Sequence, residues 1–214
     1  MPVSPTRLRK LSVLAAVAVS AGLLGACSTN SVVANAAKAA FEDRLAEEQI
    51  VDAKIKAGII ENNIGMDKML ALDLSVDVWK TRAMVTGTMT DSERRNQVGR
   101  AALKDARISA FYNEIQIVSV DAQAERREWK EKADAGAQKA AEVFDDFWIE
   151  TKISANLIST EGVSSVNYRW RSVLGTVYII GEAQTATELN TVIGVIKTIK
   201  GVKAIQNHVM VRGG

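Results

Sequence analysis

"MVTGTMTDSERRNQV", residues 84–98, recurs in altered form as "YIIGEAQTATELNTV", residues 178–192. The two stretches align with Gly87 opposite Gly181, an offset of 94 residues. Each stretch is typical of a strand that ends at its glycine and is followed by a helix. We expect both glycines to be structural, because a tight turn or close packing there leaves no room for a side chain. Self-similarity at a fixed spacing indicates one structural unit used twice.

The last strand of each copy keeps the same offset. "AFYNEIQIV" at 110–118 aligns with "AIQNHVMVR" at 204–212, and Asn113 stands opposite Asn207. The first helix does not keep the offset of 94, since "VDAKIKAGII" (51–60) matches "IETKISANLI" 98 residues later. We therefore predict about four extra residues in a loop of the first copy, a change that a loop absorbs easily.

The second copy predicts the order α-β-β-α-β. Ile149, Ile153 and Leu157 recur every four residues and form one helical stripe. A second helix over 185–201 is expected to stop at Gly201, where the first copy has Arg107. The predicted fold class is α+β, with a small mixed three-stranded sheet and two helices on one face in each copy.

The N-terminal sequence is typical of a targeting segment. Arg7, Arg9 and Lys10 precede an apolar run over 11–26, which is short for a membrane-spanning helix. The run ends at Cys27, the single cysteine of the chain, so no internal disulfide is expected. Removal of three positive charges from the net charge of +2 leaves −1, which does not favour nucleic-acid binding.

Leu24-Gly25-Ala26-Cys27 resembles the lipobox of bacterial lipoproteins. The resemblance implies cleavage before Cys27, lipid attachment (palmitate among the acyl groups) at that residue and, with Ser28 following, the outer membrane. The alternative is an ordinary signal peptide with an incidental cysteine.

The predicted organisation has five parts. They are a signal peptide at 1–26, a tether at 27–45, a first domain at 46–120, a helical linker at 121–144 and a second domain at 145–214. The linker is rich in Ala, Glu, Lys and Arg, which favours a long helix.

The repeated unit resembles the BON domain of bacterial osmotically induced and nodulation proteins. The matching features are Gly87, Gly181, the Gly201-Val202 pair, Asn113 and Asn207. Together with the lipobox, "YNEI" (112–115) and "FWIETK" (147–152), they resemble a dual-BON outer-membrane lipoprotein of the kind that binds phospholipid at the division site. That resemblance implies a non-enzymatic protein that supports envelope integrity.

The sequence offers little for catalysis or metal binding. His208 is the single histidine, and Glu114 stands at its position in the first copy. The acidic pairs Glu47-Glu48 and Asp145-Asp146 fall at predicted helix starts, where helix capping explains them. No cofactor, no metal and no enzymatic activity are expected.

Phe147 and Trp148 begin the first helix of the second copy, on a stripe beside the one expected to pack on the sheet. At the offset of 98, Ala46, Gln49 and Ile50 replace Phe144, Phe147 and Trp148, so the fold does not require these aromatics. The predicted lipid-binding residues are Phe144, Phe147, Trp148, Ile149 and Lys152. An aromatic and lysine pair suits an anionic, phosphatidylglycerol-like membrane surface; internal packing with Trp129 and contact with a protein are the alternatives.

The rival function is a periplasmic protein-interaction module. Strand 204–212 alternates and is long enough to pair with a strand of an envelope partner.

Overall fold

The computed structural model describes residues 42–134 and 146–213 of the 214-residue chain. The first unit contains α2 (Ala46–Met66), α3 (Leu70–Asp73), β1 (Leu74–Trp79), β2 (Arg82–Met89), α4 (Ser92–Ala102) and β3 (Ala110–Ile117). The second unit contains α6 (Asp146–Ser159), the 3-10 helix η2 (Ser165–Asn167), β4 (Tyr168–Val173), β5 (Thr176–Ala183), α7 (Ala186–Lys197) and β6 (Ala204–Val211). Helix α5 (Val120–Asp134) follows the first unit.

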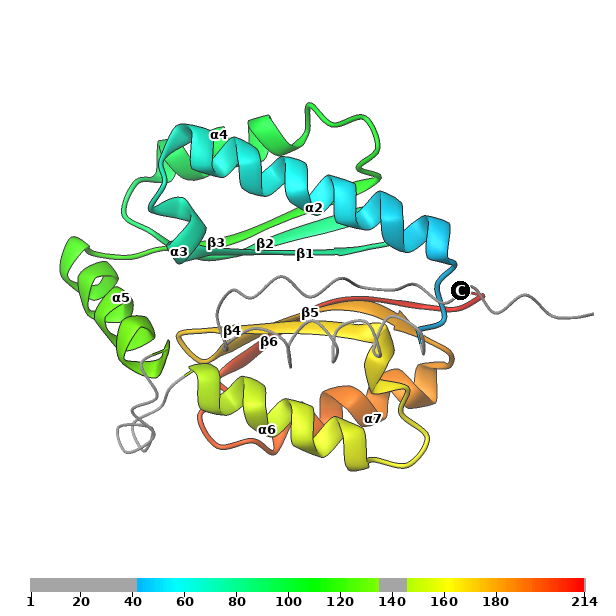
Figure 1. The fold of residues 1–214 in the computed structure, drawn as a ribbon. Coiled ribbons are helices and arrows are strands. Elements are labelled where there is room, and N and C mark those ends of the chain that lie inside the picture. Colours follow the sequence, from blue (N-terminus) through cyan, green and yellow to red (C-terminus); the bar gives the residue numbers. More distant parts are fainter. Residues whose placement is uncertain (1–41, 135–145, 214) are drawn as a thin grey trace, which may run out of the picture.

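Each unit has a mixed three-stranded sheet covered on one face by helices (Figure 1). A hairpin joins two antiparallel strands, β1–β2 and β4–β5, and the third strand pairs in parallel with the second. Helices α2 and α4, and α6 and α7, pack on the outer faces and enclose one apolar core per unit. This arrangement confirms the α+β class and the two small mixed sheets.

Helices α4 and α7 begin at capping side chains. Asp91 accepts hydrogen bonds from the backbone amides of Glu93 and Arg94 at the start of α4. Thr185 accepts one from Glu188 at the start of α7. These side chains satisfy amide groups that the first helical turn leaves unpaired, and so they fix where each helix begins.

The predicted offset of 98 for the first helix is wrong. The buried residues of α2 are Asp52, Ile55, Ile59 and Asn63, and those of α6 are Asp146, Ile149, Ile153 and Leu157. Each member of one set lies 94 residues from its counterpart. The whole unit therefore repeats at one offset, without the extra loop residues predicted for the first copy.

Gly87 and Gly181 lie inside strands β2 and β5, two residues before the strand ends that the sequence predicted for them. Both have positive φ, +135° and +157°. A Cβ atom at Gly87 would lie 2.1 Å from the Asp73 carbonyl oxygen, and one at Gly181 would lie 2.2 Å from that of Asn167. Close backbone approach beside the hairpin strand therefore requires glycine at both positions.

Gly201 does not end a helix directly. Helix α7 stops at Lys197, and Gly201, with φ +97°, lies in the turn that leads into β6. The expected helix over 185–201 is thus four residues shorter at its C-terminal end.

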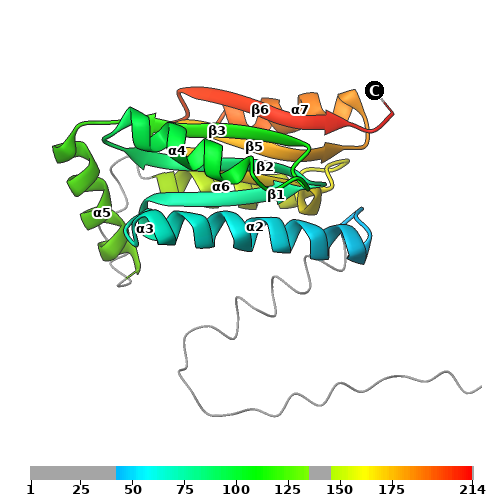
Figure 2. The ribbon, with the colours of Figure 1, turned by 90° about the horizontal axis from the view of Figure 1, so that it is seen from above.

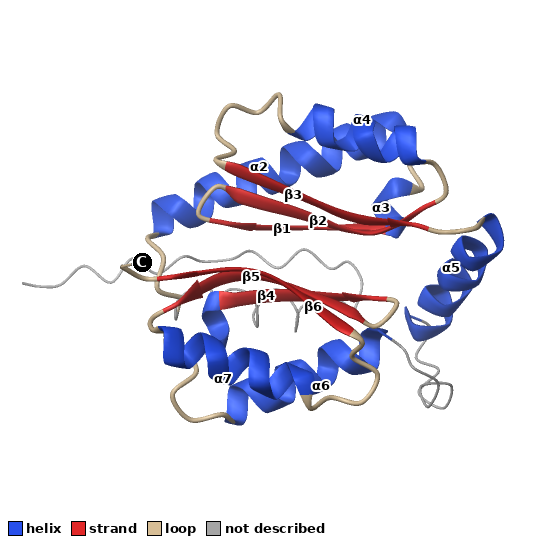
Figure 3. Ribbon diagram, turned by 180° about the vertical axis from the view of Figure 1, so that it is seen from behind, coloured by secondary structure: helices blue, strands red, loops and turns tan. Residues whose placement is uncertain are grey.

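The two sheets face each other between the two helical layers (Figures 1 and 3). Their inner faces share a small apolar cluster of Trp79, Met84, Val173, Tyr178 and Ile180, with Tyr112 packed against it. The cluster is separate from the two helix-covered cores. The units are therefore docked by their sheets.

Equivalent positions of the two copies meet across this interface. The Arg171 guanidinium binds the Asp77 carboxylate at 2.9 and 3.2 Å, and these residues are 94 apart. His208 Nε2 lies 2.8 Å from Glu114 Oε1, again 94 residues away, and its ring stacks on Tyr112. The units are thus related by a pseudo-twofold axis, and two of the positions that meet carry complementary side chains.

Further hydrogen bonds stabilise the interface between the two units. Arg82 is buried and donates to the carbonyl oxygens of Gly181 and His208, at 2.7 Å each. Gln116 donates to the Val173 carbonyl oxygen and to the Tyr178 hydroxyl, both at 2.9 Å. These bonds fix the register of one sheet on the other.

Charge reversal at the axis tests this docking. Asp77→Arg or Arg171→Asp is expected to lower the melting temperature, because like charges then meet in a buried contact. The double variant should recover most of the loss, with a coupling free energy of about 1–3 kcal/mol in a double-mutant cycle. Additive effects of the two changes would contradict the pairing.

Helix α5 connects the units along one end of the two sheets (Figure 2). Gln123 donates to the Thr88 carbonyl oxygen of the first unit, and Arg127 binds Asp73 at 2.8 Å. Arg126 forms an ion pair with Asp146 of the second unit. The predicted linker is helical as far as Asp134, and its remaining part over 135–144 lies outside the described residues.

Candidate functional site

Apolar side chains buried in the second core hold the start of α6 in place. Ile149 is 1% exposed and lies in the second core with Ile153 and Leu157. The expected packing stripe is therefore confirmed. Ile149, however, belongs to this core and not to the exposed lipid-binding face that the sequence also assigned to it.

Asp146 fixes the first turn of α6 against the β4–β5 hairpin. Its carboxylate accepts from the Ser172 hydroxyl at 2.7 Å and from the amides of Leu174 and Gly175 at 2.9 and 3.0 Å. Burial by itself raises the pKa of Asp146, but the hydrogen bonds from Arg126, Gly175 and Ser172 outweigh it and lower that pKa below its ordinary value. Asp146 thus lies in the first turn of the helix, as predicted, and its carboxylate also binds the hairpin turn.

The two neighbouring aromatic side chains face different surroundings. Phe147 is 63% exposed, whereas Trp148 is partly buried against the second core. The Lys152 ammonium lies 5.5 Å from the centre of the Trp148 ring, within cation–π range. Because the separation of neighbouring residues on a helix is about 100°, one aromatic packs inward while the next projects outward.

Phe147 lines a groove between the two units. The groove encloses about 710 Å³ and runs between α2 and α6, beside strands β1 and β4. Lys56 and Ala53 line it from the first unit, opposite Thr151 and Phe147. Ala53 is the counterpart of Phe147 at the offset of 94, so the aromatic remains a feature of the second unit alone.

Ion pairs cover much of the floor of this groove. Arg171 bridges Asp77 and Glu150, and the negative charge of Asp77 raises the pKa of Arg171. Burial raises the pKa of Glu150, and Arg171 offsets part of that effect. The cations of the floor are therefore largely matched by carboxylates, and Lys152, outside the groove, is an exposed cation on the same helix as Phe147.

Residues 42–44, which the sequence placed in the tether, form a strap across both units. Glu42 forms ion pairs with Arg44 and with Arg169 of the second unit, and Arg44 also binds Asp52. Asp43 exchanges hydrogen bonds with Asn167. Glu42 and Arg44 line the same groove as Phe147, at the end where β4 begins, so the chain enters the folded region on the side that carries the groove.

Two predicted site residues, Cys27 and Phe144, lie outside the described residues. Over residues 42–134 and 146–213, no helix combines the length and apolarity needed to cross a membrane. In the same ranges, no group of three His, Cys, Asp or Glu side chains is placed to hold a metal ion.

The strap and the groove were missed from the sequence. They depend on how the two units dock. A sequence pattern within one unit does not indicate how that unit docks on the other. The pairing of His208 with Glu114 had a signal, since the two stand at the same position of the repeat and are complementary hydrogen-bonding groups.

Comparisons with known proteins identify a family for the second unit. Residues 145–213 match the family model described as the BON domain. An uncharacterized protein in the gshII 5' region of Anaplasma centrale is 31% identical over 139 residues, which cover 65% of this chain and 82% of that protein.

Two solved structures come from CdsD, a structural protein of the type III secretion system of Chlamydia trachomatis. They have TM-scores of 0.29 at 12% and 13% identity, and they cover 71% of this chain and 90% and 94% of theirs. The BON match and the Anaplasma relative show that this chain belongs to the same family as that protein and is a BON-domain protein, with its BON domain at residues 145–213.

Proposed function

We propose that the chain is a non-enzymatic lipoprotein of the outer membrane, facing the periplasm and anchored at Cys27. It contacts anionic phospholipid through the start of α6 and supports envelope integrity. The observation that carries the proposal is Phe147, which is 63% exposed on the first turn of a helix held rigidly by Ile149 and Asp146.

The chemistry of this turn suits a bilayer surface. Transfer of an aromatic side chain from water is favourable by about 1.5–3 kcal/mol when its burial is complete. A lysine near an anionic membrane contributes roughly 1 kcal/mol. Phe147 and Lys152 therefore supply a weak contact of the kind that needs a second attachment to the membrane.

The proposed anchor supplies that second attachment. Glu42 lies fifteen positions after Cys27, and an extended chain of that length spans at most about 50 Å. Because Glu42 and Phe147 line the same groove, the tether keeps this side of the protein within reach of the membrane. Tethering raises the effective concentration of the site at the membrane, so a weak contact is formed for a larger fraction of the time.

Vesicle co-sedimentation tests the contact. We expect the chain from Ser28 onward, which holds every described residue, to bind phosphatidylglycerol vesicles and not phosphatidylcholine vesicles. Phe147→Ala should weaken the binding about tenfold because it removes the inserted ring. Ile158→Ala is the matched control, since Ile158 is 67% exposed near the other end of the same helix.

Equal binding by Phe147→Ala and the native chain would contradict the proposed contact. So would an equal loss with Ile158→Ala, which would indicate non-specific adsorption of apolar surface. Normal detergent and antibiotic resistance in a deletion strain would count against the envelope role.

A second candidate function is protein interaction through β6. This strand is an edge of its sheet, and none of its residues is fully buried. An exposed edge strand can pair with a strand from another protein. If vesicle binding proves insensitive to Phe147→Ala, this edge becomes the surface to test.

A further inference from the structure

The turn between β4 and β5 places an exposed leucine at one end of the second unit. Leu174 is 42% exposed and has a φ of +54°, and Gly175 follows it with a φ of +82°. A two-residue hairpin turn with positive φ at both positions favours asparagine followed by glycine. A bulky apolar residue in the left-handed conformation is uncommon and costs stability. The geometry of the turn therefore does not explain why a leucine is present.

This turn is joined to the start of α6. The Leu174 amide donates to the Asp146 carboxylate at 2.9 Å, and Phe147 directly follows Asp146 in the chain. The turn, the start of α6 and the start of β6 lie at the same end of the second unit (Figure 1). Leu174 and Phe147 are thus two exposed apolar side chains on neighbouring elements, and Asp146 connects them.

A lysine is fixed over the same turn. The Lys203 amide donates to the Gly175 carbonyl oxygen at 2.8 Å, and the Lys203 ammonium donates to the Leu174 carbonyl oxygen at 3.1 Å. A Cβ atom at Gly175 would lie 3.1 Å from the Lys203 side chain, so the aliphatic part of this lysine lies on the turn. The partner of the ammonium is an uncharged carbonyl, and so that bond leaves the positive charge beside Leu174 unneutralised.

A second lysine lies close to Lys203. Lys197, in the last turn of α7, and Lys203 both line a hollow of about 300 Å³ between α7 and the start of β6. The apolar residues of the hollow are Ile193, Val202, Ala204 and Ile205. The seven described residues that line it include no carboxylate. This end of the unit therefore combines apolar and positively charged surface.

The first unit differs at each of these positions. At the offset of 94, Lys80 stands for Leu174, Thr81 for Gly175, Leu103 for Lys197 and Ser109 for Lys203. Lys80 binds Glu182 of the second unit at 2.6 Å, and the Thr81 hydroxyl donates to that of Ser109 at 2.8 Å. The repeated fold therefore does not require an exposed leucine beside two lysines.

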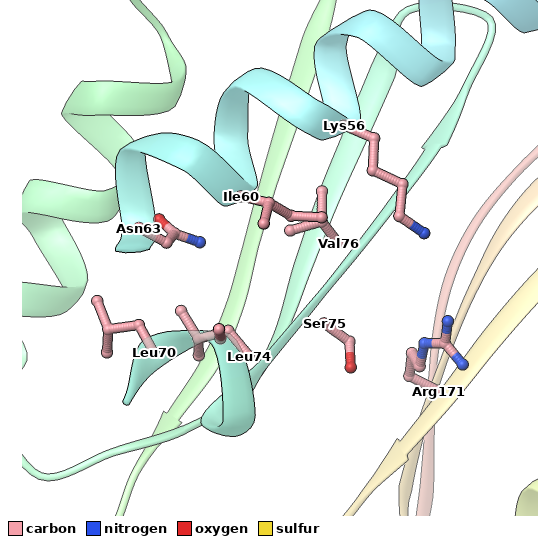
Figure 4. Close-up of a pocket in the computed structure, with 9 residues that line it drawn as sticks. Lys56, Ile60, Asn63, Leu70, Leu74, Ser75, Val76 and Arg171 are labelled. Carbon is pink, nitrogen blue, oxygen red and sulfur yellow. The ribbon is translucent and has the colours of Figure 1, made fainter. Parts of the chain in front are cut away.

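The cations of the groove are less available to an anion. Lys56 and Arg171 extend toward the same space between the units (Figure 4). Both interact with Asp77, since Arg171 binds its carboxylate at 2.9 and 3.2 Å and the Lys56 ammonium lies 4.0 Å from it. An anionic surface is consequently attracted more strongly to the end of the second unit than to the groove.

We propose that this end of the second unit forms a second contact with an anionic bilayer. Leu174 enters the headgroup boundary, and Lys197 and Lys203 bind lipid phosphates. This contact rests on the proposed function, because it adds a second element to the membrane contact of α6. An apolar side chain flanked by cations matches the boundary between acyl chains and anionic headgroups. Two contacting elements also fix the orientation of the second unit on the bilayer.

A fluorescent label tests the insertion of the turn. The chain from Ser28 onward contains no cysteine, so one introduced cysteine can carry a polarity-sensitive fluorophore. We expect the label at Leu174→Cys to shift to shorter emission wavelength on phosphatidylglycerol vesicles and not on phosphatidylcholine vesicles. The label at Leu103→Cys, which replaces a leucine 61% exposed in the first unit, should not shift.

The same label separates the two proposals. A shift for Phe147→Cys without one for Leu174→Cys would overturn the second contact and leave the proposed function standing. No shift at either position would overturn both. A shift at Leu174→Cys that follows protein concentration in the absence of vesicles would show that a second copy covers the turn, and it would also overturn the contact.

Two further variants test the affinity. Leu174→Asn should keep or raise the melting temperature, because asparagine suits this turn, and should weaken binding to phosphatidylglycerol vesicles about fivefold. Lys203→Gln should also weaken it about fivefold. Lys104→Gln, the same change of charge at an exposed position of the first unit, should leave binding within about twofold.

Native affinity in either Leu174→Asn or Lys203→Gln would overturn the contact. Equal losses with Lys203→Gln and Lys104→Gln would overturn it as well, since they would indicate a long-range effect of net charge.

Discussion

Replacing Gly181 with alanine is expected to destabilise the second unit by about 3 kcal/mol or more. Its φ of +157° is a conformation that side chains rarely adopt, which costs about 1–3 kcal/mol. The added Cβ would also lie 2.2 Å from the Asn167 carbonyl oxygen, so strands β4 and β5 must separate locally. A small domain is stable by only about 5–15 kcal/mol, so this change removes a large share.

Chemical denaturation followed by Trp fluorescence measures this loss. Gly194→Ala is the matched control, because Gly194 lies in α7 and a Cβ there meets nothing within 4 Å. The control should be stabilising by about 0.5–1 kcal/mol, since alanine favours helix over glycine. An equally stable Gly181→Ala variant would show that the strand can shift to accept a side chain.

Replacing Asp146 with alanine is expected to cost about 3–5 kcal/mol. The change leaves the hairpin amides of Leu174 and Gly175 without their acceptor and Arg126 without its partner. Leu174 also has a φ of +54°, a left-handed conformation that the carboxylate helps to hold. Glu161→Ala, at an exposed carboxylate of the same unit, should change the free energy of unfolding little.

The effect of Asp146 should depend on pH. Its pKa is lower in the folded protein than in the unfolded chain, so its stabilisation is complete above the unfolded value of about 3.9. That stabilisation is lost as the pH falls through the folded pKa. The difference in unfolding free energy between the native chain and Asp146→Asn should therefore shrink below about pH 4. A constant difference down to pH 2 would contradict the lowered pKa.

The sequence indicated the fold through features that sterics and burial impose locally. Gly87 and Gly181 stand out because no other residue fits beside the hairpin strand. Ile149, Ile153 and Leu157 stand out because a helix on a sheet buries one stripe. Such constraints act within a unit, and they are visible in a single sequence.

The register of the first helix could not be predicted for a physical reason. A shift of four residues is nearly one helical turn, so it leaves an apolar stripe almost unchanged. Asp52 and Asp146 settle the register, because each carboxylate binds the two amides of its own hairpin turn. That role depends on contact between a helix and a distant turn.

The candidate site was predicted in part. Phe147 is exposed, whereas Ile149 is buried and Trp148 packs partly against the core. The direction of each side chain depends on the neighbours that surround α6 in space. The groove beside Phe147 depends on docking of the units, and so it has no signature in one helix.

The pseudo-twofold axis bears on how such a chain arises. In a dimer of identical single units, each position on the axis meets a copy of itself, so Asp77 would face Asp77. Tandem duplication of the coding sequence removes this restriction, since the two copies then mutate independently. Asp77 with Arg171 and Glu114 with His208 are pairs that a dimer of identical units cannot form and that a fused gene can encode. Substitutions at these positions should consequently be inherited as linked changes, one in each half of the gene.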